Sequence, residues 1–91
     1  MAEVLTETDI RRRLRTFIVE NFLYTRQDFA FTDDDSLLRR GIFDSLGVTE
    51  VISFVEQTWD LSVPEQDVTD VNFGTVSGMS RYVTRQRFDQ G

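Results

Sequence analysis

The chain has 91 residues, enough for one domain with a modest core, and 40% of them are hydrophobic, which argues against disorder. It contains no Cys and no His, so disulfides, thiolate chemistry, Cys/His zinc sites and a Ser-His-Asp triad are excluded. No stretch approaches the ~20 apolar residues of a membrane span, and residues 1–5 lack the features of a secretory signal. We expect a single domain over residues 1–91, located in the cytoplasm.

The net charge of −6 is unevenly distributed along the chain. Residues 32–70 hold ten acidic residues against two Arg, whereas residues 1–31 are neutral and residues 71–91 are net positive. The acidic middle would repel nucleic acid and anionic membranes, and it would attract a basic protein partner. We therefore expect a monomer that binds proteins and no nucleic acid.

The first predicted helix begins at a cap on Thr6 or Thr8 and runs to about Tyr24. Its apolar face consists of Ile10, Leu14, Phe17, Ile18 and Phe22. Its early turns also carry Arg11, Arg12, Arg13 and Arg15. A basic run of this kind is typical of a solvated face, although Arg near a helix N-terminus opposes the helix dipole.

Residues 25–43 form a connection that is long for a compact domain. We expect its apolar side chains to enter the core and order it, namely Phe29, Phe31, Leu37, Leu38 and Ile42. The consecutive acids Asp33, Asp34 and Asp35 suggest calcium, but the alternate ligand spacing, central Gly and distal Glu of an EF-hand loop are missing. We expect no metal site.

The second predicted helix runs from Ser45 to Trp59, and both Asp44 and Ser45 are good N-cap residues. Its apolar stripe is Val48, Val51, Ile52, Val55 and Trp59. With that stripe turned inward, the solvent face carries Leu46, Glu50, Ser53 and Gln57. Pro64 cannot continue the helix, so the segment 60–64 ends it.

The rest of the chain predicts a turn of helix from Glu65 to Asp70 and a last helix, capped by Thr75, that reaches about Phe88. We expect Val76, Met79, Tyr82 and Val83 to face inward, and Gly78 to mark a close helix crossing. No pair of strands is indicated. The predicted fold class is all-α, a small four-helix bundle with three main helices and one short helix.

The pair Asp44-Ser45 has a simple structural explanation as a helix cap, but the wider sequence resembles the acyl carrier protein family. The resemblance rests on Gly41-Ile42-Phe43-Asp44-Ser45-Leu46-Gly47, on the following acidic helix to Trp59, and on Val63-Pro64. It covers roughly residues 8–88. In that family the Ser of an Asp-Ser-Leu motif receives 4′-phosphopantetheine from coenzyme A.

The resemblance implies a bundle of acyl-carrier type that carries a group and is not an enzyme. Ser45 would hold 4′-phosphopantetheine covalently, Asp44 would complete the motif, and the thiol would bind an acyl or aminoacyl group as a thioester. The implied partners are a phosphopantetheinyl transferase, a loading ligase or synthase, and downstream acyl-using enzymes. Leu46, Glu50, Ser53 and Gln57 would form the face that such partners read.

Three alternatives remain open at this level. Asp35-Ser36-Leu37 also reads Asp-Ser-Leu, but no full helix starts at Ser36, so we assign the prosthetic group to Ser45 and a local cap to Ser36. The second alternative is a small acidic helical adaptor that is never modified. The third concerns the type of carrier. Gly47 and the segment Val71-Asn72-Phe73 are similar to the discrete D-alanyl and aminoacyl carrier proteins, which suggests a specialised free-standing carrier rather than the general fatty-acid protein.

Overall fold

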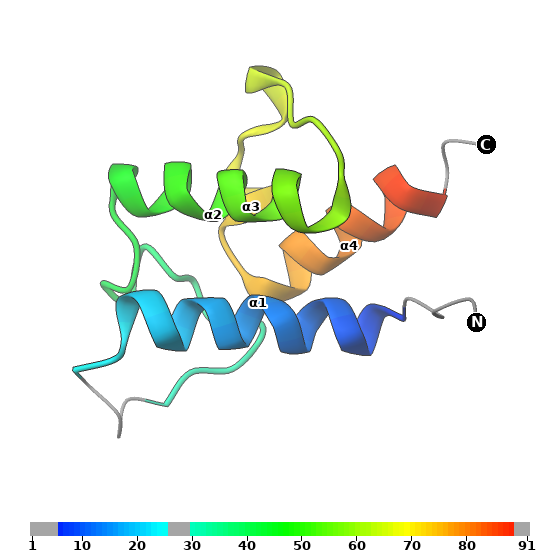
Figure 1. Ribbon diagram of the computed structural model, residues 1–91. Helices are drawn as coiled ribbons and strands as arrows, with labels where there is room; N and C mark the ends of the chain where they lie inside the picture. The colour runs from blue at the N-terminus through cyan, green and yellow to red at the C-terminus, as the bar shows by residue number, and fades with distance from the viewer. Residues whose placement is uncertain (1–5, 26–29, 89–91) are drawn as a thin grey trace.

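A computed structural model describes residues 6–25 and 30–88 of the chain, and these residues form helices and connections without a strand. The elements are α1 (Glu7–Phe22), α2 (Ser45–Trp59), the 3-10 helix η1 (Glu65–Asp67), α3 (Asp70–Phe73) and α4 (Val76–Phe88). α1 and α2 run in opposite directions, with α1 ending and α2 beginning at the same end of the molecule (Figure 1). The predicted all-α class and small four-helix bundle are confirmed.

α1 and α4 begin at the cap residues that the sequence predicted. The Thr6 hydroxyl accepts the N–H of Asp9 at 3.1 Å, and the Thr75 hydroxyl accepts the N–H of Gly78 at 2.9 Å. The first N–H groups of a helix have no partner within it, so each of these acceptors satisfies a donor and marks the start of its helix. α1 ends two residues before the expected Tyr24, because Leu23 leaves the helical conformation and its side chain enters the core.

α2 spans the predicted residues, but its end is closed by a residue other than the proline. Asp60 adopts the left-handed conformation with φ of 53°, and the N–H of Leu61 returns to the carbonyl of Glu56 at 3.1 Å. This arrangement satisfies carbonyls that the last helical turn leaves unpaired. Pro64 lies further on, where it leads into η1.

The predicted short helix from Glu65 to Asp70 is in fact two elements. η1 ends at Asp67, and α3 begins at Asp70 with its own cap, in which the Thr69 hydroxyl accepts the N–H of Asn72 at 3.2 Å. Thr69 therefore starts a separate turn of helix.

α4 is the element against which the other helices pack, since α1, α2 and α3 all contact it. The residues predicted to face inward are buried, namely Val76, Met79, Tyr82 and Val83. The close crossing predicted at Gly78 is confirmed, because a Cβ there would overlap the backbone carbonyl of Val71. A glycine at this position allows α3 to lie directly on α4.

Aromatic side chains help to join α1 to α2 and to the residue segment just before it. Ile10, Leu14 and Ile18 of α1 and Val51, Val55 and Trp59 of α2 are buried, as expected. At the edge of this core the rings of Phe17 and Phe54 stack with centroids 4.2 Å apart, and the rings of Phe22 and Phe43 lie 4.9 Å apart. Val48 and Ile52 are only partly buried and pack against the same core.

The connection before α2 is ordered by a few buried side chains. Phe31, Leu37 and Ile42 are buried as predicted, whereas the expectation for Leu38 is wrong, since this residue is 42% exposed. The backbone of Leu37 explains the difference. Its N–H donates to Gly74, and its carbonyl accepts the N–H groups of Ile42 and Phe43, so Leu37 points inward and its neighbour points out. Phe29 lies outside the described residues.

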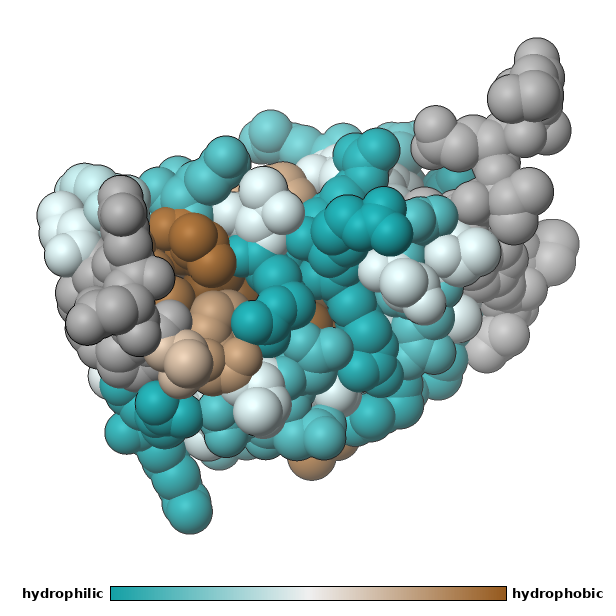
Figure 2. All heavy atoms as spheres, turned by 90° about the horizontal axis from the view of Figure 1, so that it is seen from below, coloured by the Kyte–Doolittle hydropathy of each residue, from teal (hydrophilic) through white to brown (hydrophobic). Residues whose placement is uncertain are grey.

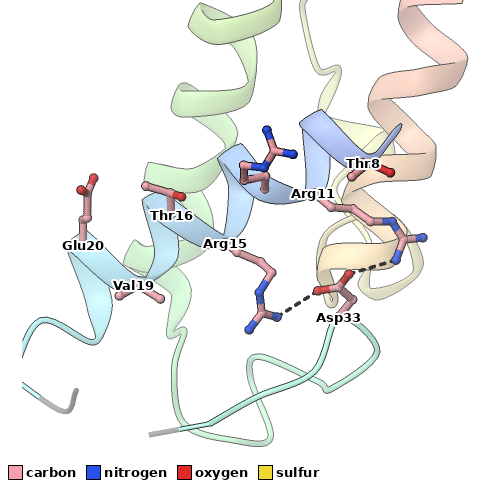
Figure 3. Close-up of a pocket in the computed structure, with 8 residues that line it drawn as sticks. Thr8, Arg11, Arg15, Thr16, Val19, Glu20 and Asp33 are labelled. Carbon is pink, nitrogen blue, oxygen red and sulfur yellow. Dashed lines mark hydrogen bonds and ion pairs between the residues drawn. The ribbon is translucent and has the colours of Figure 1, made fainter. Parts of the chain in front are cut away.

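The arginines of α1 do not form a uniformly solvated face. Arg11 and Arg15 both reach Asp33 in the connection, at 3.0 and 2.9 Å, as Figure 3 shows. Hydrogen bonds to Glu7 and Asp33 raise the pKa of the Arg11 guanidinium. Arg15 also donates to the carbonyl of Phe31 and lies 4.1 Å from the centre of its ring. These partners explain why Arg is tolerated near the start of α1.

The three consecutive acids are engaged by protein donors. Asp33 takes the two arginines, Asp34 accepts the hydroxyl of Ser77 at 2.6 Å, and Asp35 accepts the N–H of Thr32 at 2.8 Å. No group of three possible metal ligands occurs in residues 6–25 and 30–88. Asp33 therefore ties the connection to α1, Asp34 ties it to α4, and Asp35 holds the connection together locally.

The face of the molecule below α1 is mostly hydrophilic, with one hydrophobic patch at the end where α1 terminates (Figure 2). This distribution is what an amphipathic surface helix produces when its apolar stripe is turned to the core. Within the described part of the chain, no helix combines the length and the apolar content that crossing a membrane requires.

Candidate functional site

The segment before Ser45 is held in place by one turn and two buried anchors. Gly41 adopts φ of +74°, a left-handed conformation that a side chain would strain. The next two residues, Ile42 and Phe43, are buried, and both donate their N–H groups to the carbonyl of Leu37, at 2.9 and 3.0 Å. The chain therefore reaches Asp44 from a fixed direction.

Asp44 caps α2 and Ser45 is the first residue of the helix. A carboxylate oxygen of Asp44 accepts the N–H of Gly47 at 2.9 Å, and its carbonyl accepts the N–H of Val48 at 3.0 Å. Of the two cap candidates in the sequence, Asp44 thus takes this role, and the Ser45 hydroxyl makes no hydrogen bond to the part of the chain that the structure describes. Ser45 is exposed at the helix end that carries partial positive charge and unpaired N–H groups.

Gly47 is buried against the end of α1. A Cβ at this position would lie 3.0 Å from Cε1 of Phe22 and 3.5 Å from Cδ1 of Phe43. Such a contact is tight, so a larger residue would push the aromatic rings away. Packing against Phe22 and Phe43 therefore explains why a glycine follows Ser45-Leu46, which the sequence alone did not show.

A depression of about 280 Å³ lies beside Ser45, between the end of α1 and the start of α2. We call it the α1–α2 notch; its lining includes Asn21, Phe22, Phe43, Asp44, Leu46 and Glu50. Ser45 itself is outside the lining, but the residues on both sides of it contribute. Phe43 belongs to the motif itself, but sequence reasoning missed Asn21 and Phe22 as neighbours of this site, because only the packing of α1 against the start of α2 brings them there.

The solvent face predicted for α2 is present. Leu46, Glu50, Ser53 and Gln57 are all exposed, and Leu46 is 67% exposed although it is apolar. An apolar side chain surrounded by polar and acidic ones is a feature of protein docking surfaces. The structure thus places all four predicted partner-face residues on one side of α2, next to Ser45.

The rival Ser36 occupies a different setting. Its hydroxyl accepts the N–H of Arg39 at 3.2 Å, and its carbonyl accepts the N–H of Arg40 at 3.0 Å, so it starts a single turn. Ser36 is also partly buried, whereas Ser45 is exposed. The predicted role of Ser36 as a local cap is confirmed.

A larger hollow, of about 590 Å³, lies away from Ser45 on the outer side of α1. Figure 3 shows Thr8, Thr16, Val19 and Glu20 along the helix and Asp33 across from them. Two of the arginines that line it are already paired with Asp33, so it presents little unpaired positive charge to a ligand. The smaller notch is the hollow that adjoins the candidate site.

Comparisons with known proteins add no identification. No protein-family model matches the sequence, and no curated protein matches it.

Proposed function

We propose that this protein is a carrier that holds an acyl or aminoacyl group as a thioester on 4′-phosphopantetheine attached to Ser45. The proposal rests on the different roles of Asp44 and Ser45 at the start of α2. Asp44 provides the cap, so the adjacent Ser45 hydroxyl is exposed and available to a modifying enzyme. A serine whose own hydroxyl made the cap hydrogen bond would have to give it up on modification.

The residues around Ser45 fit a phosphate ester. The Gly47 N–H is taken by Asp44, which leaves the N–H groups of Ser45 and Leu46 as the donors of the first turn without a helical partner. Donors and partial positive charge at a helix N-terminus favour an attached phosphate. The group would supply a thiol, which the chain lacks because it has no Cys.

The attachment is a transfer between two oxygens. The Ser45 oxygen would form a bond to the phosphorus of the pantetheine phosphate, and the diphosphate bond of coenzyme A would break to release adenosine 3′,5′-bisphosphate. The hydroxyl proton would pass to a base of the transferase. This chain would contribute the exposed alcohol and its rigid position, and the transferase would contribute the catalysis.

The solvent face of α2 is the proposed docking surface for the transferase and for the enzymes that load and use the cargo. Leu46 would serve as the apolar anchor and Glu50 as the nearest charge, with Ser53 and Gln57 further along the helix. The wider acidic middle of the chain would mainly speed the encounter with basic partners, because exposed ion pairs contribute only ~0–1 kcal/mol each.

The experiment is incubation with coenzyme A and a phosphopantetheinyl transferase of broad specificity, followed by intact-protein mass spectrometry. The wild type and Ser36→Ala should each gain the mass of one phosphopantetheine, and Ser45→Ala should gain none. Ser36→Ala is a matched control because it removes the other serine in an Asp-Ser-Leu sequence.

Absence of the mass gain in the wild type, or a gain at another residue, would overturn the proposal. An unmodified wild type that still binds a basic protein through Leu46 and Glu50 would support the alternative, a small helical adaptor. The type of carrier is a separate question. If the modified protein supported general fatty-acid elongation efficiently, our proposal of a specialised aminoacyl or acyl carrier would be contradicted.

A further inference from the structure

We propose that the α1–α2 notch is a resting site for the pantetheine arm on Ser45, so that the carrier holds the arm against its own surface between encounters with enzymes. This inference rests on the proposed attachment at Ser45. It assigns a role to Asn21, Phe22 and Phe43, which the attachment itself does not require.

The position of the notch is the first argument. Asp44 and Leu46, the neighbours of Ser45 on both sides, line it, and it extends to Asn21 and Phe22 at the end of α1. An arm tethered to Ser45 would therefore start at the rim of the notch. Its volume of about 280 Å³ suits a narrow chain rather than a bulky ligand, since small-molecule pockets span roughly 300–1,000 Å³.

The chemistry of the lining is the second argument. Leu46 and the partly buried Phe22 offer apolar surface to the two methyl groups of the arm, and the buried ring of Phe43 also belongs to the lining. The side-chain N–H of Asn21 donates to the carbonyl of Phe17 at 2.8 Å, which fixes the amide and leaves its oxygen as an acceptor for an amide N–H of the arm. The Glu50 carboxylate is a second acceptor at the same notch. The arm contains two amides, so its N–H groups have acceptors in the notch and its methyl groups have apolar surface.

The acidic residues of the lining also determine which part of the arm would enter the notch. Asp44 and Glu50 would disfavour the phosphate within the notch, whereas the N–H groups at the start of α2 favour it at the rim. The uncharged amide portion is thus the part that would enter. Leu46 belongs both to the notch and to the partner face, so an enzyme that covers Leu46 would compete with the resting arm and release it.

Gly47 keeps the floor of the notch in place. A side chain at this position would press on Phe22 and Phe43, whose rings lie 4.9 Å apart. The absence of a side chain lets both rings remain below the arm. The same glycine thereby joins α1 to α2 and shapes the site.

The test compares apo and modified protein by NMR, after mass spectrometry has shown that the arm is on Ser45. We expect nuclear Overhauser effects between the arm's methyl groups and the rings of Phe22 and Phe43. We also expect larger shift changes at the Asn21 side-chain amide than at Gln57 or Asn72. Asn21→Phe, at an exposed position, should narrow the notch and abolish these contacts. The control Gln66→Phe, at an exposed position in η1 away from the notch and from the partner face, should retain them.

The two proposals fail in different ways. A wild type that gains the mass but shows shift changes only within two residues of Ser45, and no contact to either ring, would overturn the resting site and leave the carrier function standing. A wild type that gains no mass would overturn both. The ring contacts in the wild type decide the question even if Asn21→Phe fails to fold.

Discussion

Ser77 and Ser80 lie one turn apart on α4 and are both buried, but their hydroxyls are in opposite situations. Ser77 donates to Asp34 at 2.6 Å and accepts from Arg11 at 3.2 Å. The Ser80 oxygen is buried without a hydrogen-bond partner in the described part of the chain. A buried polar group without a partner costs free energy, and a paired one leaves its partner unsatisfied when it is removed.

The same substitution should therefore have opposite effects at these two positions. Ser77→Ala should lower the free energy of unfolding by about 1–3 kcal/mol, because Asp34 and Arg11 lose a partner. Ser80→Ala should leave it unchanged or raise it by up to about 1 kcal/mol, because only an unpaired hydroxyl is lost. Urea denaturation of both variants measures the difference, and equal losses would contradict the assignment of the two hydroxyls.

At the scale of elements, the connection before α2 is fastened to α1 and α4 by charge as well as by apolar contacts. Asp33 lies between Arg11 and Arg15, its side chain is 27% exposed, and its carbonyl accepts the N–H of Ser77 at 2.9 Å. A partly buried acid shared by two guanidinium groups makes stronger hydrogen bonds than a surface ion pair.

Asp33→Asn should lower the free energy of unfolding by about 1–3 kcal/mol, because two arginines lose their common anion. Added salt should reduce the stability of the wild type more than that of the variant. The control is Arg12→Gln. Its side chain is 70% exposed and, among residues 6–25 and 30–88, forms an ion pair with Asp9 alone, so a change within about 0.5 kcal/mol is expected there. A variant at Asp33 as mild as the control would show that the buried apolar residues alone hold the connection.

The segment between α2 and α3 is attached to α4 through Tyr82. The Tyr82 hydroxyl donates to a carboxylate oxygen of Asp67 at 2.7 Å, and Arg85 approaches the Tyr82 ring at 5.9 Å. Burial, and then the hydrogen bond to Asp67, raise the pKa of Tyr82 from 10.0 to about 12. The folded protein therefore holds this proton more tightly than the unfolded chain does.

The sign of the pH effect follows from that difference. The stabilisation is complete below pH 10 and is lost as the pH rises from 10 to about 12, because the unfolded chain releases the proton first. The free energy of unfolding should fall across this range, and Tyr82→Phe should remove this component and be less stable at pH 7 by about 1–2 kcal/mol. Denaturation at a series of pH values measures both effects. A wild type and variant with parallel pH profiles would contradict the bond to Asp67.

At the scale of the whole molecule, one core joins all the helices. α4 lies against the other three helices, and Trp59 at the end of α2 is 5% exposed and meets Phe54 edge to face with centroids 5.7 Å apart. The predicted burial of Trp59 is confirmed. A single core of this size should unfold in one step.

Trp59→Ala should lower the free energy of unfolding by ~3–5 kcal/mol, because it removes a large buried side chain and leaves a cavity. Thermal melts followed by far-ultraviolet circular dichroism measure the loss, and Trp59→Phe is the control that retains an aromatic ring and should lose less. In the wild type, Trp fluorescence and circular dichroism should give one shared transition. A Trp59→Ala melt that matches the wild type would contradict the role of this residue in the core.

The sequence by itself determined the local features of this protein. The bounds of α2, the cap at Thr75 and the apolar stripes follow from interactions within a few residues, and the sequence narrowed the other two caps to Thr6 or Thr8 and to Asp44 or Ser45. The exposure of Leu46 was also predictable, because the apolar stripe of α2 leaves the opposite side of the helix to solvent.

Only the tertiary structure decided the features that join distant segments. Asp33, the partner that Arg11 and Arg15 share, lies about twenty residues away in the connection, so a local pattern could not reveal it. The exposure of Leu38 depends on a turn held by Gly74, and the notch beside Ser45 exists because Phe22 packs over Gly47. Sequence periodicity reports which face of a helix is apolar, whereas contacts between elements depend on how the side chains of both elements fit together.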